Sequence, residues 1–372
     1  MIFVKTNSNL KFWFPIFLRV ILFLSLPFQT QAAIWSVDNN SNNPAHFTTI
    51  QAAIDSAQSG DTILVAPSSN PYGFNTTITI NKKIVLIGAG YDNLTGGNTI
   101  LHNLEFVNES PSQGASGSYL SGLRFQYNNS IVSFKPDLSG GSLASQQIND
   151  VIIERCYLLH VRYYGGAPGV LFKNHKLINC RIEGDINLGY SSSANINLDT
   201  ILISNNLFNS SAIRTSSSSA GQNTVFVRNN DFINNGYAFY SQNIVVANNI
   251  FYSTNPGNPS PVNSCPNCAF INNLTFGYSN DTLPTPGGIG SGNIIGQDPL
   301  FVNYSSDLTL SPGSPAINAG SDGTDIGISG GSYPFDVGAP PRIPHIQLFD
   351  VPNSAIPING FLPFELKAKT HN

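Results

Sequence analysis

A short pattern of apolar and polar positions recurs four times between Thr200 and Phe276. In each copy, an apolar strand, an Asn-Asn corner and a second apolar strand follow one another. The copies are Ile203–Phe208, Val227–Phe232, Val246–Phe251 and Phe270–Thr275, and their second asparagines lie 24, 19 and 24 residues apart. Repeats with periods of this size are typical of solenoids, in which short units stack on their neighbours.

Alternation within each copy predicts which side chains face the core, because successive strand residues point to opposite faces. The inward positions are Ile203, Val227 and Val246 with Phe208, Phe232 and Phe251, whereas Ser204, Arg228 and Ala247 face outward. Asn tolerates a left-handed backbone, and its amide can bond the backbone and the matching Asn about 4.8 Å away on the next coil. We therefore expect a structural ladder of Asn206, Asn230, Asn249 and Asn273.

Weaker copies of the pattern extend upstream to Cys180 and Cys156, at steps of 26 and 24 residues. The alternative interpretation is a set of unrelated short strands whose Asn-Asn pairs mark ordinary turns. The apolar positions keep their phase through six copies, which favours stacked coils.

A different pattern precedes the repeats. One apolar helical face, formed by Ile50, Ala53, Ile54 and Ala57, predicts a helix over about residues 48–58, with Thr48 or Thr49 as its N-cap. A strand follows from Thr62. An open stack exposes its core and a strand edge at the first coil, so a helix across that end would protect both.

That helix is followed by Gly60-Asp-Thr-Ile63 and by a strand that ends at Pro67. This order resembles the N-terminal cap of right-handed parallel β-helix proteins, the pectate-lyase-like superfamily and its secreted bacterial relatives. The Asn-Asn repeat and the closing phrase Ser314-Pro-Ala-Ile317, with a Gly-rich tail at Asp325–Gly327, are similar to the same proteins. The resemblance covers roughly Ile34 to Gly338. It implies an all-β fold, a right-handed parallel β-helix solenoid with an N-terminal capping helix.

The two ends of the chain are predicted to lie outside the solenoid. Residues 1–33 carry three basic residues, no acid and the apolar run Val20–Leu26, which predicts a secretory signal peptide cleaved near Ala32 or Ala33. An uncleaved membrane anchor is the alternative, although Pro15 and Arg19 interrupt the apolar stretch. Residues 34–338 are expected to form the β-helix, and 339–372 a linker with a terminal strand. The mature chain would be secreted, extracellular or on the cell surface.

Charge limits the possible partners and chemistry. Only 10% of the 372 residues are charged, and the formal net charge is −4. Without the signal peptide, 14 basic residues would face 21 acidic ones, so a nucleic acid is not an expected partner. No segment of the mature chain is long and apolar enough to span a bilayer as a helix.

Four cysteines would enter an oxidising compartment with the exported chain. Cys156 and Cys180 occupy the ladder position of consecutive coils, so their Cα atoms should lie about 5 Å apart, which permits either a disulfide or two buried thiols. Cys265 and Cys268 lie in a Pro-rich loop, where a local disulfide is favoured over half of a metal site.

No cofactor is expected, although calcium is possible. Asp322 and Asp325 in a Gly-rich turn could hold a cation, although acids in turns usually cap backbone groups. The enzymatic motifs implied by the resemblance are missing. Glycoside hydrolases with this fold carry Asn-Thr-Asp, Asp-Asp and Gly-His-Gly, and none of these occurs here. The Asp-rich calcium cluster of pectate lyases has no clear match either.

One segment stands out in its charge. Between Glu154 and Asp185, eight of 32 residues are charged. If Ile182 is inward, then Arg181, Glu183 and Asp185 face outward beside Tyr157 on the coil below. An aromatic plane beside carboxylates and a guanidinium predicts a ligand-binding site for a sugar, formed by Tyr157, Arg181, Glu183 and Asp185. A solvated structural face and a catalytic site are the alternatives, and no catalytic residue can be assigned.

Three functional classes follow from these observations. The first is a secreted protein that binds polysaccharide or a cell-surface glycan. The second is a polysaccharide lyase or glycoside hydrolase with an atypical site, which needs a base or a set of carboxylates. The third is a structural or adhesive rod on the cell surface. The excursions at Asn209–Gln222 and Ser253–Asn267 are further places where a solenoid can carry function.

Overall fold

The computed structural model describes residues 32–92, 97–110, 113–126, 129–136, 147–165, 170–189, 196–215, 224–284, 290–336, 345–350 and 365–369, with backbone only for the last two ranges. The chain divides into two compact units, Met1–Ala32 and Ala33–Asn372. The second unit is described below. The predicted signal peptide, 1–33, lies almost entirely outside the described residues.

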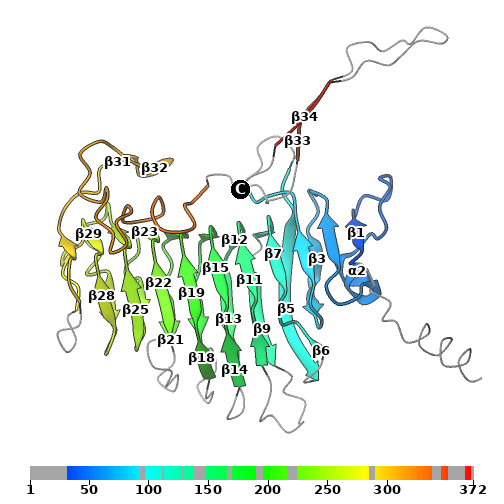
Figure 1. Ribbon diagram of the computed structural model, residues 1–372, viewed down its shortest axis with the longest axis horizontal. Helices are drawn as coiled ribbons and strands as arrows, with labels where there is room; N and C mark the ends of the chain where they lie inside the picture. Colours follow the sequence, from blue (N-terminus) through cyan, green and yellow to red (C-terminus); the bar gives the residue numbers. More distant parts are fainter. Residues whose placement is uncertain are drawn as a thin grey trace, which may run out of the picture. The chain divides into compact units, whose positions relative to one another are not determined.

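Three sheets, in which every pairing except β5–β6 is parallel, build most of the second unit, which confirms the predicted all-β parallel β-helix solenoid. Sheet A, whose strands lie side by side in Figure 1, consists of β1 (Ile34–Val37), β2 (Thr62–Val65), β4 (Val85–Ile87), β7 (Tyr119–Ser121), β11 (Ile152–Glu154), β15 (Lys176–Ile178), β19 (Ile201–Ser204), β22 (Val225–Arg228), β25 (Ile244–Ala247) and β28 (Ala269–Ile271). Sheet C consists of β10 (Gln147–Asn149), β14 (Val170–Lys173) and β18 (Ile196–Asp199).

Sheet B is the largest sheet, and one of its strands follows each corner of the Asn-Asn repeat. Its strands are β3 (Tyr72–Ile80), β5 (Ile100–Ser110), β6 (Gln113–Gly114), β8 (Arg124–Phe125), β9 (Ile131–Pro136), β12 (Tyr157–Leu158), β13 (His160–Tyr163), β16 (Arg181–Ile182), β17 (Ile186–Leu188), β20 (Leu207–Asn209), β21 (Ile213–Thr215), β23 (Asp231–Ile233), β24 (Phe239–Tyr240), β26 (Ile250–Tyr252), β27 (Val262–Ser264), β29 (Leu274–Phe276) and β30 (Ile294–Ile295).

The register joins equivalent positions of successive copies. In sheet A, Ile203 is opposite Val227, which is opposite Val246, and Val246 is opposite Phe270. In sheet B, Phe208, Phe232 and Phe251 are opposite one another in the same way. The three rings are fully buried and stack with centroid separations of 4.4 and 5.0 Å. The predicted column of inward phenylalanines is therefore confirmed.

The predicted helix is α2 (Ile50–Ser56), shorter at both ends than the expected 48–58. Thr49 is the N-cap, and its hydroxyl accepts a hydrogen bond from the Ala52 amide at 3.2 Å. Ile50, Ala53 and Ile54 are buried, and the helix contacts β1, β2 and β3. Gln51 bonds the backbone of Thr79 on β3, so the helix is fixed to the first coils by polar as well as apolar contacts.

The two asparagines of each corner have different roles. The first has a left-handed backbone, with φ between 49° and 58° at Asn205, Asn229, Asn248 and Asn272. The second points inward and forms the predicted ladder of Asn206, Asn230, Asn249 and Asn273, in which the backbone and side-chain amides of each Asn donate to the side-chain oxygen of the next. The ladder continues to Asn293, and its other end meets the Cys180 amide. Tolerance of the left-handed region explains the first Asn, and amide bonding explains the second.

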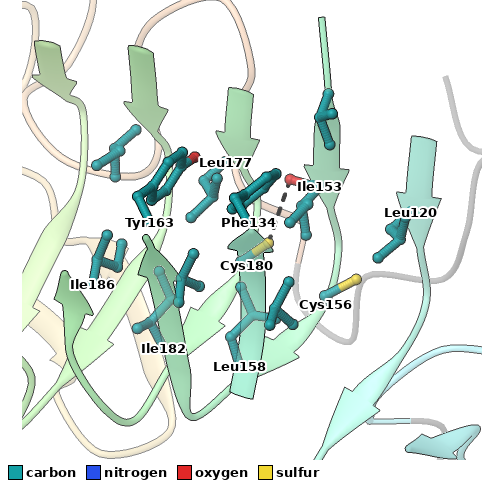
Figure 2. Packing of buried hydrophobic residues seen from close by; sticks show 14 of the residues in the cluster. Leu120, Phe134, Ile153, Cys156, Leu158, Tyr163, Leu177, Cys180, Ile182 and Ile186 are labelled. Atoms are coloured by element: carbon teal, nitrogen blue, oxygen red, sulfur yellow. Dashed lines mark hydrogen bonds between the residues drawn. The ribbon is translucent and has the colours of Figure 1, made fainter. Parts of the chain in front are cut away.

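The cysteines divide into one bonded and one unbonded pair. Cys265 and Cys268 form the expected local disulfide, with Cα atoms 5.5 Å apart. Cys156 and Cys180 occupy consecutive coils and are buried free thiols. In Figure 2 their sulfurs lie among the core side chains around Phe134 and Ile153, and the Cys180 thiol contacts the carbonyl oxygen of Ile153 at 3.7 Å. Of the two alternatives for this pair, the structure shows the thiols.

The parallel coils end at β30, and the chain then returns along them. An antiparallel hairpin, β31 (Phe301–Asn303) and β32 (Asp307–Leu310), is followed by the segment Asn318–Asp336, which we call the return segment. Figure 1 shows it in orange, crossing the ends of the sheet A strands. A second antiparallel pair is formed by β33 (His345–Asp350) and β34 (Glu365–Lys369), within the range predicted as a linker and terminal strand.

The first asparagine of successive corners holds the return segment. Asn248 accepts a hydrogen bond from the Ser321 amide. The other four side chains donate to backbone carbonyl oxygens: Asn272 to Ala319, Asn229 to Asp325, Asn205 to Ile328 and Gly330, and Asn179 to Tyr333. The segment thus meets the coils in reverse order. It ends where Asp336 lies 3.9 Å from Arg155.

Candidate functional site

Tyr157 lies between two guanidinium groups on the outer face of sheet B. The register places Arg124 opposite Tyr157 on one side and Arg181 opposite it on the other. The guanidinium carbon of Arg124 lies 4.5 Å from the centre of the Tyr157 ring, and that of Arg181 lies 5.9 Å from it. Cations at these distances are attracted to the ring face, so both arginines help to hold the column together.

Glu183 orients Arg181. Its Oε1 accepts a hydrogen bond from Arg181 Nε at 2.6 Å, and its Oε2 accepts from Asn209 Nδ2 at 2.8 Å. The Arg181 side chain is 41% exposed and that of Glu183 only 17%. Burial alone would lower the pKa of Arg181, but the hydrogen bond and charge of Glu183 raise it. Burial, with the charge of Glu183, raises the pKa of Tyr157, although both arginines oppose this. Arg181 is therefore a permanently charged donor held at the surface.

Asp185 belongs to a neighbouring cluster. Its Oδ2 accepts from Arg214 Nε at 2.7 Å, and its Oδ1 accepts from the Ala212 amide at 3.1 Å. Arg214 also lies over the Tyr240 ring, at 4.2 Å. The structure thus brings Tyr157, Arg181 and Glu183 into contact, and gives Asp185 a different cationic partner.

A cleft of about 460 Å³ opens beside Arg181. The loop between β4 and β5 contributes Tyr91 and Asp92, and sheet B contributes Arg181, Asn209 and, directly after β23, Asn234. The β31–β32 hairpin contributes Tyr304 and Leu308, and the return segment contributes Ile328 and Phe335. Tyr91 also approaches Tyr157, with ring centroids 6.4 Å apart. Aromatic surface, amides and charges of both signs therefore converge on one concave site.

A second cleft, of about 570 Å³, lies on the outer face of sheet A. Its floor is Ile152, Leu202 and Phe226, and Lys176 and Arg228 lie among them. Lys176 already donates to the Tyr333 hydroxyl of the return segment. The sheet B cleft is smaller, but it presents more polar groups suited to a hydroxylated ligand, so we regard it as the better candidate.

Sequence reasoning missed several members of the sheet B site. Arg124 was hidden because the step from Leu123 to Cys156 spans 33 residues, which obscures the register. Tyr304 and Phe335 reach the site only because the chain returns after β30. Arg214 had a usable signal, since it lies one coil beyond Asp185 in the excursion that begins at Asn209.

Asp322 and Asp325, the two acids that could hold calcium, are hydrogen-bonded within the return segment. Asp322 accepts from the amide and hydroxyl of Thr324. Asp325 accepts from the Asn318 amide and the Ser329 hydroxyl. In the part of the chain that the structure describes, no three acidic, histidine or cysteine side chains gather as a metal site would require. Calcium binding here stays a prediction.

Comparisons with known proteins find a likeness among solved structures. Neither a protein-family model nor a curated protein matches the chain. Among solved structures, the chain is similar to a crystal structure of pectate lyase Pel9A, at 15% identity and a TM-score of 0.39, over 80% of this chain and 96% of that one. Across the described ranges, no helix is long and apolar enough to cross a membrane.

Proposed function

We propose that this protein binds an extracellular glycan in the sheet B cleft, with Arg181 as the central contact. The observation that carries the proposal is the convergence of Arg181, Asp92 and the amides of Asn209 and Asn234 with the exposed ring of Tyr304 around one cleft. Sugars have apolar C–H faces and rims of hydroxyls, so a site for them needs aromatic surface beside donors and acceptors.

Each group in the cleft has a distinct role in this proposal. Glu183 and Tyr157 fix the Arg181 guanidinium, whose remaining N–H groups donate to ligand oxygens. Asp92 accepts hydrogen bonds from ligand hydroxyls, and the Asn209 and Asn234 side chains can both accept and donate. Tyr304 stacks on a sugar ring. The site is partly solvated, so each polar contact adds little and the affinity is modest. Asp185 and Arg214 extend the polar surface to a neighbouring subsite.

The test is a glycan-array screen of the mature chain, followed by titration of any hit with paired variants. Replacing Arg181 and Glu183 together with Ala should abolish binding. The matched control replaces Lys173 and Asp199, an exposed ion pair at 3.1 Å on sheet C, and should leave binding unchanged. The control variant should melt close to the parent, because an exposed ion pair contributes about 1 kcal/mol or less. The Arg181/Glu183 variant should lose more stability, since Glu183 is largely buried and also accepts from Asn209, so its folding is checked before binding is measured.

Two results would move the site elsewhere. If the Arg181/Glu183 variant binds as tightly as the parent, the cleft is not the site. If replacing Asp185 and Arg214 abolishes binding while the first variant retains it, the ligand lies on the outer face beyond the cleft. Degradation assays on any hit would test the catalytic alternative.

A further inference from the structure

A second, small apolar core lies outside sheet B. The outward positions of four successive strands are Leu207, Asp231, Ile250 and Leu274, which are opposite one another in register. Ala316 and Ile326 cover Ile250 and Leu274, and all four side chains are buried. The return segment and the residues just before it therefore form a lid of apolar contacts over one stretch of the outer face.

Asp231 is the exception within this column. It is fully buried, with 0% exposure. Its Oδ1 accepts a hydrogen bond from the Ile328 amide at 3.2 Å, while its Oδ2 has no hydrogen-bond partner within the described residues. Gly327, with φ of 90°, permits this close approach, because a Cβ at that position would lie 2.4 Å from Oδ1. The return segment thus rests directly on a carboxyl group.

Among the described residues, the surroundings of Asp231 offer no counter-charge. Leu207 of β20 and Ile250 of β26 flank it in register, and Gly327 and Ile328 face it from the return segment. The titratable and charged residues on these elements and at the corner before β23 are Tyr252, Asp322, Asp325, Tyr333, Asp336 and Arg228. Asp325 is bonded within the return segment, and Arg228 is exposed with its guanidinium over the Phe226 ring at 5.1 Å.

We propose that the return segment is a pH-sensitive cover of sheet B, seated while Asp231 is protonated and released when Asp231 loses its proton to solvent. An isolated carboxylate is far more costly to bury than a neutral carboxylic acid, because it loses its hydration without gaining a cation. Seating the segment therefore requires the proton, and ionisation favours the released form.

The sign of the pH dependence follows from the two forms. Burial raises the pKa of Asp231 well above its ordinary range in the seated form, although the bond from Ile328 acts in the opposite direction. In the released form the carboxyl is solvated and titrates near its ordinary value of about 3.9. The seated form therefore holds the proton to higher pH. Seating is strongest at low pH and is lost as the pH rises through the raised pKa.

Release would change the sheet B cleft. Ile328 and Phe335 of the return segment form one of its walls. Removing that wall would open the cleft along the outer face and admit a longer ligand. This consequence rests on the proposed glycan function, whereas the release itself needs no ligand and is tested without one.

Hydrogen–deuterium exchange of the full chain between pH 5 and pH 9 tests the proposal. Peptides covering 318–336 report on the cover, and peptides covering β2 and β3 in the first coils serve as an internal reference. After correction for the intrinsic pH dependence of exchange, protection of the cover relative to the reference should fall about tenfold per pH unit between the ordinary pKa of about 3.9 and the raised pKa of the seated form, and should level off above the raised pKa.

Three variants separate Asp231 from other causes. Asp231→Asn keeps the shape of the neutral acid and should make relative protection independent of pH. Asp231→Leu puts an apolar side chain between Leu207 and Ile250 and should also make relative protection independent of pH. It serves as the test if the Asn variant does not fold. Asp336→Asn removes an acid of the return segment itself and should keep the pH dependence of the parent. Any of three results would overturn the proposal. Relative protection could stay constant with pH in the parent, it could fall with pH in both Asp231 variants as it does in the parent, or the protection of the reference peptides could fall as much as that of the cover.

Discussion

The side-chain oxygen of Asn230 accepts hydrogen bonds from both the backbone amide and the side-chain amide of Asn206, at 2.9 and 3.0 Å. Asn230 makes the same pair of bonds to Asn249, at 2.9 Å each, and its Nδ2 also donates to the carbonyl oxygen of Ile203. One amide group therefore joins three successive coils. All three asparagines are fully buried.

Asn230→Ala should lower the free energy of unfolding by about 3 kcal/mol, because it leaves buried donors of Asn206 unpaired. Urea denaturation would measure the loss. The control is Asn197→Ala, at an exposed position of β18, which should change stability by no more than about 0.5 kcal/mol. Similar losses in the two variants would contradict a structural role of the ladder.

Asn248 should show two separable contributions. Its side chain accepts from the Ser321 amide at 2.9 Å, and its backbone is left-handed, with φ of 58°. Asn248→Gly removes the hydrogen bond together with the buried side chain but keeps the left-handed backbone unstrained, at a cost of about 1 kcal/mol. Asn248→Ala adds the strain of a Cβ in this backbone region, about 1 kcal/mol more. Urea denaturation of both variants should rank Ala below Gly, and equal midpoints would show that the conformation does not matter.

His175 should make the protein less stable in mild acid. It is buried beside Tyr163, its Nδ1 contacts the Tyr163 hydroxyl at 3.1 Å, and its Nε2 contacts the Ile148 carbonyl oxygen at 2.7 Å. These contacts suit a neutral imidazole that donates from Nε2 and accepts at Nδ1. Burial lowers its pKa from 6.5 to about 4, against the opposing effect of the Ile148 bond.

Because the folded pKa lies below the unfolded one, the unfolded chain takes up the proton first as the pH falls. The contribution of His175 to stability should be complete above about pH 6.5 and should decline by about 3 kcal/mol towards pH 4. His175→Gln should remove this part of the pH dependence in urea denaturation at matched pH values. Parallel pH profiles of parent and variant would argue against a buried neutral histidine.

The unbonded thiols should be unreactive in the native protein. Cys156 and Cys180 are fully buried, and burial raises the pKa of the Cys180 thiol. The thiolate is the reactive form, so a thiol reagent should label neither residue before unfolding and both afterwards. Mass spectrometry without reduction should find Cys265 and Cys268 linked. Labelling of Cys180 in the folded chain would contradict the packing in Figure 2.

The sequence predicted the solenoid because its core positions repeat. Phe208, Phe232 and Phe251 keep one phase relative to the Asn-Asn corner, and parallel stacking turns that phase into a column. The helix before the first coil was predicted for a similar reason, since a 3.6-residue period differs visibly from alternation. Only its ends shifted, as Thr49 caps it and Ser56 ends it.

The candidate site was predicted only in part, because its members come from parts of the chain without a period. Arg181 and Tyr157 follow the coil register and were placed correctly beside each other. Asp185 lies beyond the short strand β16, where alternation no longer fixes direction, and it turns to Arg214. The return segment binds largely through backbone groups, and those leave no pattern in the side chains.

The return segment also changes how the molecule can come apart. In a solenoid each coil normally contacts only its neighbours, so unfolding can fray inward from either end, one coil at a time. Here a single length of chain is bonded to the corners at Asn179, Asn205, Asn229, Asn248 and Asn272. Opening any one of these coils also breaks bonds to that shared segment. The coils from β15 to β28 should therefore unfold as one cooperative block, leaving the earlier coils as the part that frays.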